Sequence, residues 1–124
     1  MPLEIERKFL VNSNHYKIGA KSVDIMQAYL SIQENIAIRV RIEGFNASLT
    51  IKSKVSERVN REYEYSIPLD EAQSMIKMSQ HSLITKTRFL VDYKRHTFEV
   101  DEFHGDNEGL VVAEIELELS LIHI

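Results

Sequence analysis

Ionic side chains recur in pairs two residues apart, on segments whose other residues are typical of β-strands. The pairs, in chain order, are Glu4 and Glu6 (followed by Lys8), Arg39 and Arg41, Lys52 and Lys54, Glu62 and Glu64, Lys86 and Arg88, and Glu114 and Glu116. Residues i and i+2 of a strand lie on one face, so each pair places two charges on the same side of a sheet. The alternate positions are mostly apolar, for example Ile38, Val40 and Ile42. The apolar face must therefore pack on something, and the charged face must line something.

The simplest interpretation of charged pairs is a solvated face, because antiparallel sheets often expose one side to water. Here the pairs segregate by sign along the chain, in the order acid, base, base, acid, base, acid. Like charges on one face repel unless an opposite charge lies between them. Divalent cations can hold acidic pairs together, and phosphates can do the same for basic pairs. The whole set therefore favours a barrel with a charged lumen and a multivalent ionic ligand.

Composition sets the outer bounds of this interpretation. A chain of 124 residues, 44% hydrophobic and 27% charged, is expected to form one soluble domain. There is no apolar run long enough for a membrane span, and the acidic N-terminus is unlike a signal peptide. The absence of cysteine excludes disulfides and thiolate metal sites, so a cytoplasmic location is expected. The net charge of −4 argues against binding nucleic acid through the overall field.

The alternation of residue types predicts eight strands, at 3–11, 24–32, 36–44, 47–54, 60–67, 85–93, 96–103 and 111–119. One helix is predicted over 69–80, after Pro68, from the spacing of Leu69, Ala72, Met75, Ile76 and Ser79. A helical turn is expected within 13–21, and turns at 43–46 and 105–109. The predicted fold is α+β: an eight-stranded antiparallel β-barrel with few helices on the outside.

The chain resembles the CYTH superfamily, also called triphosphate tunnel metalloenzymes. The resemblance is carried by eight short motifs in the family's order: Glu4-Ile5-Glu6-Arg7-Lys8, Gln27-Ala28-Tyr29-Leu30, Arg39-Val40-Arg41, Thr50-Ile51-Lys52-Ser53, Arg61-Glu62-Tyr63-Glu64-Tyr65, Lys86-Thr87-Arg88-Phe89, Glu99-Val100-Asp101-Glu102-Phe103 and Glu114-Ile115-Glu116-Leu117-Glu118. Each motif is weak alone, but together they span about 115 residues. The resemblance implies a β-tunnel that binds a triphosphate and divalent metal ions. Residues 1–124 are expected to form a single CYTH domain with a shortened C-terminal segment, truncated after the last tunnel strand.

The resemblance is strongest to small bacterial inorganic triphosphatases, which implies metal-dependent hydrolysis of tripolyphosphate to pyrophosphate and phosphate. Mg²⁺ or Mn²⁺ is the expected cofactor. The partner would be a small-molecule triphosphate, with no nucleic acid or membrane partner and with a homodimer as one possible assembly. Two alternatives stay open. One is processing of nucleoside or thiamine triphosphates, as by a class IV adenylate cyclase or a thiamine triphosphatase. The other is a non-catalytic domain that binds polyphosphate or nucleotide.

The same resemblance, with the chemistry of each side chain, suggests roles for individual residues. Carboxylates suit a hard divalent ion; the candidates for a first ion are Glu4, Glu6, Glu114 and Glu116, with Asp101 and Glu64 toward a second and Glu62 as a weaker candidate. Guanidinium and ammonium groups suit phosphate; the candidates are Lys8, Arg39, Arg41, Lys52, Lys86 and Arg88. Lys52 is also the candidate catalytic base, on the expectation that basic neighbours depress its pKa. Tyr29 is expected to orient Lys52 or the attacking water.

Overall fold

The computed structural model describes residues 3–11 and 13–117 of the chain. It contains the strands β1 (Leu3–Leu10), β2 (Lys21–Ile32), β3 (Ile36–Glu43), β4 (Asn46–Lys54), β5 (Val59–Ile67), β6 (Ile84–Tyr93), β7 (His96–Phe103) and β8 (Val111–Leu117). The helix α1 (Leu69–Met78) lies between β5 and β6, and 3₁₀ turns occur at η1 (His15–Lys17) and η2 (Gly105–Asn107). The eight predicted strands and the one predicted helix are confirmed. The positions 118 and 119 of the last predicted strand lie outside the described residues.

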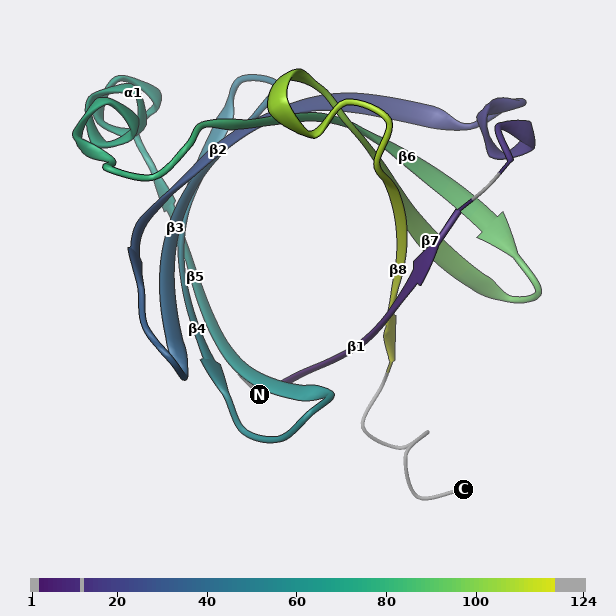
Figure 1. Cartoon of the computed structure of the whole chain (residues 1–124), viewed down its shortest axis with the longest axis horizontal. Helices are drawn as coiled ribbons and strands as arrows, with labels where there is room; N and C mark the ends of the chain where they lie inside the picture. Colours follow the sequence, from purple (N-terminus) through teal and green to yellow (C-terminus); the bar gives the residue numbers. More distant parts are fainter. Residues whose placement is uncertain (1–2, 12, 118–124) are drawn as a thin grey trace.

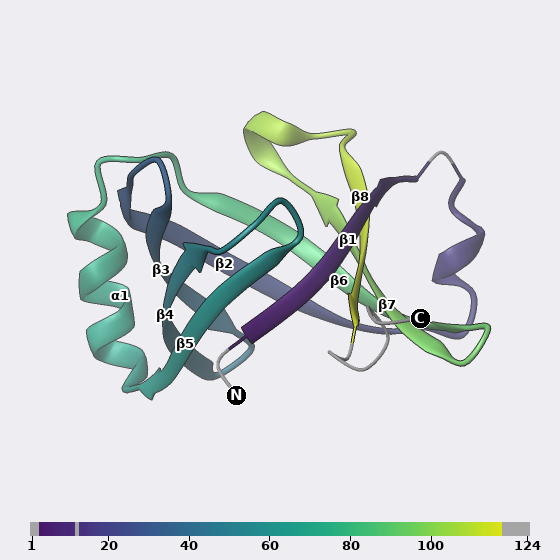
Figure 2. The same ribbon diagram turned by 90° about the horizontal axis from the view of Figure 1, so that it is seen from below.

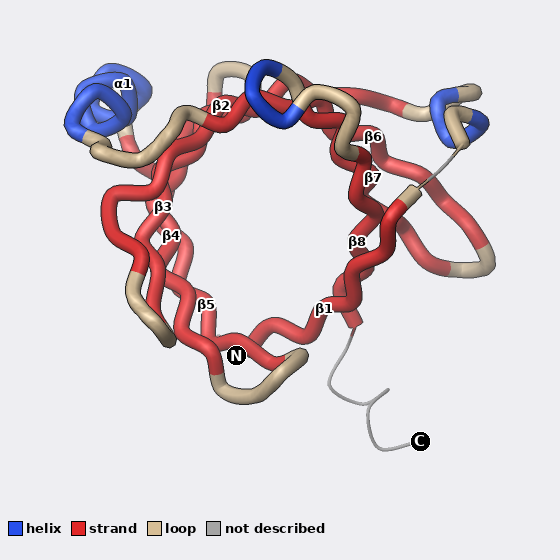
Figure 3. Tube along the Cα trace, in the orientation of Figure 1, coloured by secondary structure: helices blue, strands red, loops and turns tan. Residues whose placement is uncertain are grey.

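The strands close into a barrel in the order β1-β5-β4-β3-β2-β6-β7-β8, and every pairing is antiparallel. Figure 1 looks through the ring that they form, and Figure 3 shows the helical segments outside it. The first and last strands are neighbours, with Glu6 opposite Glu116 and Lys8 opposite Glu114. Because side chains alternate across a strand, this register sends the ionic residues of both strands to the same face.

Helix α1 covers part of the barrel's outer surface. Its apolar residues Leu69, Met75 and Ile76 pack against a cluster centred on Val40 of β3 and Ala47 of β4. Figure 2 shows the helix lying beside these strands at one side of the barrel. The outer apolar face and the charged inner face follow from the same alternation. An apolar core cluster therefore lies between the barrel wall and α1, and the barrel interior is lined mainly by charged side chains.

Two element boundaries differ from the sequence prediction by more than one residue. Strand β2 begins at Lys21, three residues earlier than expected, because residues 21–23 continue its pairing with β6 as far as Leu90. Helix α1 ends at Met78, and Ser79 adopts an extended conformation. The Ser79 hydroxyl donates a 2.6 Å hydrogen bond to the backbone carbonyl of Tyr29, where the β2–β3 register shifts. Ser79 therefore anchors the helix end to the barrel and is not part of the helical stripe. Among the described residues, no helix is both long and apolar enough to cross a membrane.

Val40 tests whether the cluster beneath α1 provides the stability of the barrel. Its side chain is 0% exposed, so Val40→Ala should leave a cavity and lower the free energy of unfolding by about 2 kcal/mol. Val55→Ala, at a valine that is 52% exposed in the β4–β5 turn, should cost less than about 0.5 kcal/mol. Urea denaturation measures both values. Equal losses for the two variants would contradict this location of the core.

Candidate active site

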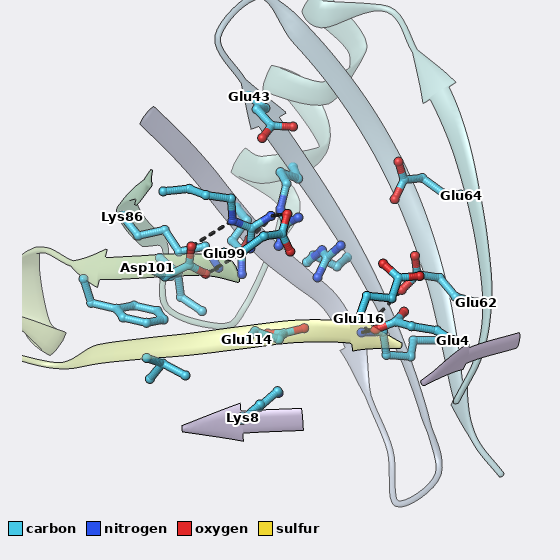
Figure 4. Close-up of a pocket in the computed structure, with 18 of the residues that line it drawn as sticks. Glu4, Lys8, Glu43, Glu62, Glu64, Lys86, Glu99, Asp101, Glu114 and Glu116 are labelled. Carbon is cyan, nitrogen blue, oxygen red and sulfur yellow. Dashed lines mark hydrogen bonds and ion pairs between the residues drawn. The ribbon is translucent and has the colours of Figure 1, made fainter. Parts of the chain in front are cut away.

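The interior of the barrel is a cavity of about 480 Å³ to which all eight strands contribute side chains. Its lining contains eight acidic and six basic residues. Of the residues predicted as site residues, all but Glu6 line this cavity: Glu4, Lys8, Tyr29, Arg39, Arg41, Lys52, Glu64, Lys86, Arg88, Asp101, Glu114 and Glu116. The prediction of a charged lumen is thus confirmed. Figure 4 shows that the two signs are unevenly distributed, with Glu4 and Glu62 at one end and Lys86 at the other.

Three carboxylates crowd together where β1 meets β8. Glu4, Glu6 and Glu114 each offer an oxygen within 4.8 Å of the others, since Glu4 and Glu6 share one face of β1 and Glu114 lies on the adjoining strand. Burial, together with hydrogen bonds to Glu62 and Glu6, raises the pKa of Glu4 to about 9. Burial and the neighbouring Glu6 raise the pKa of Glu114 to about 7. Burial opposes ionisation of Glu6 too, but hydrogen bonds from Glu114 and Glu4 lower its pKa to about 2.

This acidic group fits a divalent cation. One oxygen of Glu4 and one of Glu6 are buried without a hydrogen-bond partner, which is costly unless a cation or proton satisfies them. Carboxylate oxygens are the ligands that hard cations such as Mg²⁺ take. Two other glutamates that the sequence predicted as metal ligands, Glu64 and Glu116, also line the cavity. They are exposed and do not belong to the group formed by Glu4, Glu6 and Glu114.

Lys52 lies beside the acidic group. Its Nζ is 3.1 Å from a Glu4 oxygen, 3.4 Å from Glu62 and 3.9 Å from Glu6. Burial would lower the pKa of Lys52, but Glu4 and Glu6 outweigh it and raise the pKa. The expectation that basic neighbours depress this pKa is therefore wrong, because the charges nearest Nζ are carboxylates. Glu62, treated as a weaker candidate from the sequence, is a direct partner of Lys52.

A second group of charges lies on β6 and β7, where Arg88 is opposite Asp101. The guanidinium of Arg88 donates to both Asp101 oxygens, at 2.8 and 2.9 Å, and also to Glu99 at 3.1 Å. Lys86 donates to Asp101 at 2.7 Å. Burial opposes ionisation of Asp101, but Arg88 and Lys86 lower its pKa. Both oxygens of Asp101 are thus engaged by Arg88 and Lys86 in this structure, and its role at a second metal site stays a prediction.

The basic residues of β3 and β6 lie close enough together to repel one another, as the carboxylates of β1 and β8 do. Burial, with the nearby Arg39 and Arg88, lowers the pKa of Arg41 to about 10, and its Nε donates to Gln27 at 2.8 Å. Burial, with Arg41 and Arg88, lowers the pKa of Lys86 to about 8 although Asp101 opposes the shift. The lysine with a depressed pKa is therefore Lys86. Arg39 Nε is buried without a partner. A bound anion would relieve this repulsion and supply the missing acceptor.

The sequence reasoning missed several residues that line the cavity. Glu43 follows Arg39 and Arg41 at the same parity, and Glu99 precedes Asp101 by two positions, so the spacing rule could have found both. Gln27 is two residues before Tyr29 and was passed over because it is uncharged. Ile84, Phe103 and Val112 also line the cavity. The sequence could not identify these three residues, because an apolar residue that faces the cavity cannot be distinguished by pattern from one that packs in a core.

Comparison with known proteins connects this geometry to a family. A model of the CYTH domain matches residues 2–122. The chain is 41% identical over 118 residues to a protein of Acetivibrio thermocellus named inorganic triphosphatase. The matched region covers 94% of this chain and 76% of that protein.

Solved structures share the architecture. The crystal structure of the inorganic triphosphatase NE1496 matches with a TM-score of 0.67 at 28% identity, over 97% of this chain and 77% of that one. PH1012 from Pyrococcus horikoshii OT3 matches with a TM-score of 0.75 at 22% identity, over 94% of this chain and 79% of that one. At that identity, the second match is evidence of the fold alone.

The crowded carboxylates predict a pH dependence of stability when divalent ions are removed by a chelator. Glu4 and Glu114 bind protons more tightly in the folded state, with pKa values of about 9 and about 7, so folding takes up protons above their ordinary pKa. Stability must then fall as the pH rises from about 5 to about 7.5. Lys86, with its lowered pKa of about 8, has the opposite effect only at higher pH.

Thermal melts in chelator should therefore show a Tm that decreases across this range. Glu4→Gln keeps a neutral group at the position and should flatten the decrease, whereas Glu34→Gln, in the exposed β2–β3 turn, should not. A Tm that rises with pH in the native chain, or the same slope in Glu4→Gln, would contradict the shifted pKa of Glu4.

Proposed function

Because the chain belongs to the CYTH family, we propose that it is a metal-dependent hydrolase that splits inorganic tripolyphosphate into pyrophosphate and phosphate within the tunnel. One observation carries the proposal: a single cavity holds both a crowded basic group and a crowded acidic group. Phosphoryl transfer depends on neutralising the phosphate charge and on positioning the reacting groups. The name of the relative in Acetivibrio thermocellus supports the same activity.

The basic group provides the phosphate-binding surface. Arg39, Arg41 and Arg88 offer planar forks that bind phosphate oxygens bidentately, and Lys86 and Lys8 offer point charges. Arg39 and Arg41 are the better placed, because Arg88 is already held by Asp101 and Glu99. The repulsion between Arg39, Arg41 and Arg88 favours a ligand with several negative charges over a singly charged one.

The acidic group would hold the metal. Glu4, Glu6 and Glu114 form the first site, for Mg²⁺ or Mn²⁺, with Glu116 beside them on β8. When bound, such an ion neutralises phosphoryl oxygens and orients them for attack. The lining has more acids than bases, and a triphosphate adds further negative charge, so additional cations are needed for a neutral complex. Glu64 is a further candidate ligand. Asp101 fits better as the partner that orients Arg88 and Lys86.

Lys52 and Tyr29 are the proposed catalytic residues. A Lys52 that keeps its proton, as its carboxylate neighbours favour, stabilises negative charge on the transferred phosphoryl group and does not abstract a proton from water. Its hydrogen bond to Glu4 holds the ammonium at the boundary between the acidic group and the phosphate surface. Tyr29, which lines the same cavity from β2, orients Lys52 or the attacking water through its hydroxyl.

A nucleoside triphosphate is the second candidate substrate, favoured by the apolar part of the lining. Phe103 lies under Lys86, whose Nζ is 5.2 Å from the ring centroid, and Ile84 and Val112 also face the cavity. An aromatic ring beside a cation is a surface on which a base can stack. Phosphate release from tripolyphosphate, ATP and thiamine triphosphate, with and without Mg²⁺ or Mn²⁺, separates these functions.

The homodimer, the cytoplasmic location and the lack of nucleic acid or membrane partners stay predictions.

Glu6→Gln tests the metal assignment. The substitution preserves size but removes the charge that a divalent ion needs, so tripolyphosphate hydrolysis should fall at least about a hundredfold. The residual activity should require more metal, as read from Mg²⁺ titrations. Glu34→Gln is the matched control on an exposed turn and should behave as the native chain. Identical metal titrations for Glu6→Gln and the native chain would refute Glu6 as a ligand.

Binding can be tested without turnover. Excess tripolyphosphate with Mg²⁺ should raise the Tm, because a ligand that binds only the folded state stabilises it by mass action. Arg39→Ala removes a cation whose Nε has no acceptor in the structure and should weaken the shift. Lys94→Ala, in the exposed β6–β7 turn, should leave it unchanged. A native chain with no Tm shift would argue against triphosphate binding in the tunnel.

A further inference from the structure

A second cavity opens where β1 separates from the β4–β5 hairpin. The two strands β1 and β5 pair at only three positions, from Leu3–Arg61 to Ile5–Val59. At the end of this contact the backbone N–H of Glu6 donates to the carbonyl of Arg58, at 3.3 Å. Beyond it lies a cavity of about 480 Å³ bounded by residues 6–9 and by the hairpin. Figure 2 shows the hairpin turn beside β1.

This cavity adjoins the tunnel, because Lys8, Tyr29 and Lys52 line both. Its charge differs from that of the tunnel. Five of its lining residues are basic, namely Arg7, Lys8, Lys52, Lys54 and Arg58, and two are acidic, Glu6 and Glu57. The tunnel lining has more acids than bases, and the whole chain has a net charge of −4. A basic cavity on an acidic protein creates a local positive potential that attracts anions.

Three of these cations are available to a ligand. In residues 3–11 and 13–117, no carboxylate lies within 4.0 Å of the charged groups of Arg7, Lys54 or Arg58. Arg58 and Lys54 flank a compact turn, in which the N–H groups of Val55 and Ser56 both donate to the carbonyl of Val59, at 2.8 and 3.0 Å. The Lys54 N–H donates to the carbonyl of Asn35 at 2.9 Å. The backbone that carries both side chains is therefore held in place.

We propose that this cavity is a second phosphate subsite, in which Lys54 and Arg58 bind an inorganic phosphate group next to the tunnel. The inference rests on the proposed triphosphate site, which it extends along the lining shared at Lys8, Tyr29 and Lys52. The excess of basic residues suits a phosphate without an accompanying metal. The phosphate group has two sources: the fourth phosphate of a chain longer than tripolyphosphate, or released orthophosphate.

The experiment compares three proteins: the native chain, Lys54→Ala/Arg58→Ala, and the control Lys77→Ala/Lys94→Ala. The control removes the same charge from exposed positions on α1 and on the β6–β7 turn. Isothermal titration calorimetry without divalent ions gives the affinities for tripolyphosphate and tetrapolyphosphate. Orthophosphate is then titrated into each protein saturated with tripolyphosphate. Lys54→Gln/Arg58→Gln replaces the alanine variant if circular dichroism shows that the latter does not fold.

If the subsite takes a fourth phosphate, the native chain and the control should bind tetrapolyphosphate about tenfold more tightly than tripolyphosphate, as expected for two exposed charge contacts. The double variant should bind the two ligands equally. If it takes orthophosphate, the saturated native chain and control should still bind orthophosphate and the double variant should not. The subsite is refuted if neither binding differs between the double variant and the control.

Failure of the proposed function would look different. A native chain that releases no phosphate from tripolyphosphate with Mg²⁺ or Mn²⁺ would contradict hydrolysis, whereas the calorimetric comparison would still decide on the subsite. Conversely, normal hydrolysis with no difference between the double variant and its control in either titration would remove the subsite and leave the tunnel function intact.

Discussion

Closure of the barrel by the pairing of β1 with β8 is the contact on which the charged site depends. These strands lie at opposite ends of the chain, and their register brings Glu114 within reach of Glu4 and Glu6. The carboxylates then share one small volume with two buried oxygens that lack partners. This arrangement is unfavourable by itself, because buried like charges raise each other's pKa or must be neutralised. The strand pairing holds the charges together, and Lys52 neutralises only part of them.

The fold tolerates a charged interior because its apolar packing is elsewhere. Val40 and Ala47 point outward to Ala72 and its neighbours on α1, so the stabilising core does not compete with the lumen for space. A barrel packed with apolar side chains inside would have no room for a multivalent anion. Placing the core on the outer face leaves the inner face free to concentrate charge. The cost of that concentration is reduced by internal pairs such as Arg88 with Asp101.

Binding of a charged ligand would relieve this repulsion between like charges in the tunnel. Within the described part of the chain, Arg39 and Arg41 of β3 have no ion-pair partner, and the three crowded carboxylates of β1 and β8 have only Lys52 and Lys8 as nearby cations. A triphosphate with divalent ions would satisfy both groups at once, which is why the proposed function needs both in one cavity. The side cavity beside Arg58 differs because its excess charge is positive, so it suits an anion without a metal.

The period-two spacing of the charges predicted, without any structure, the strands and the shared face of the ionic side chains, and most of the charged residues that line the cavity belong to the spaced pairs. Spacing is a local property, and it fixes which face a side chain is on. The spacing does not fix which residue of a neighbouring strand a given side chain contacts. Only the tertiary structure decided that Lys52 lies among Glu4, Glu6 and Glu62, and that Lys86 lies near Arg41 and Asp101. The pKa of Lys52 is therefore raised where the sequence predicted a lowered one, and the lowered pKa belongs to Lys86, because these values depend on charges that neighbouring strands bring together.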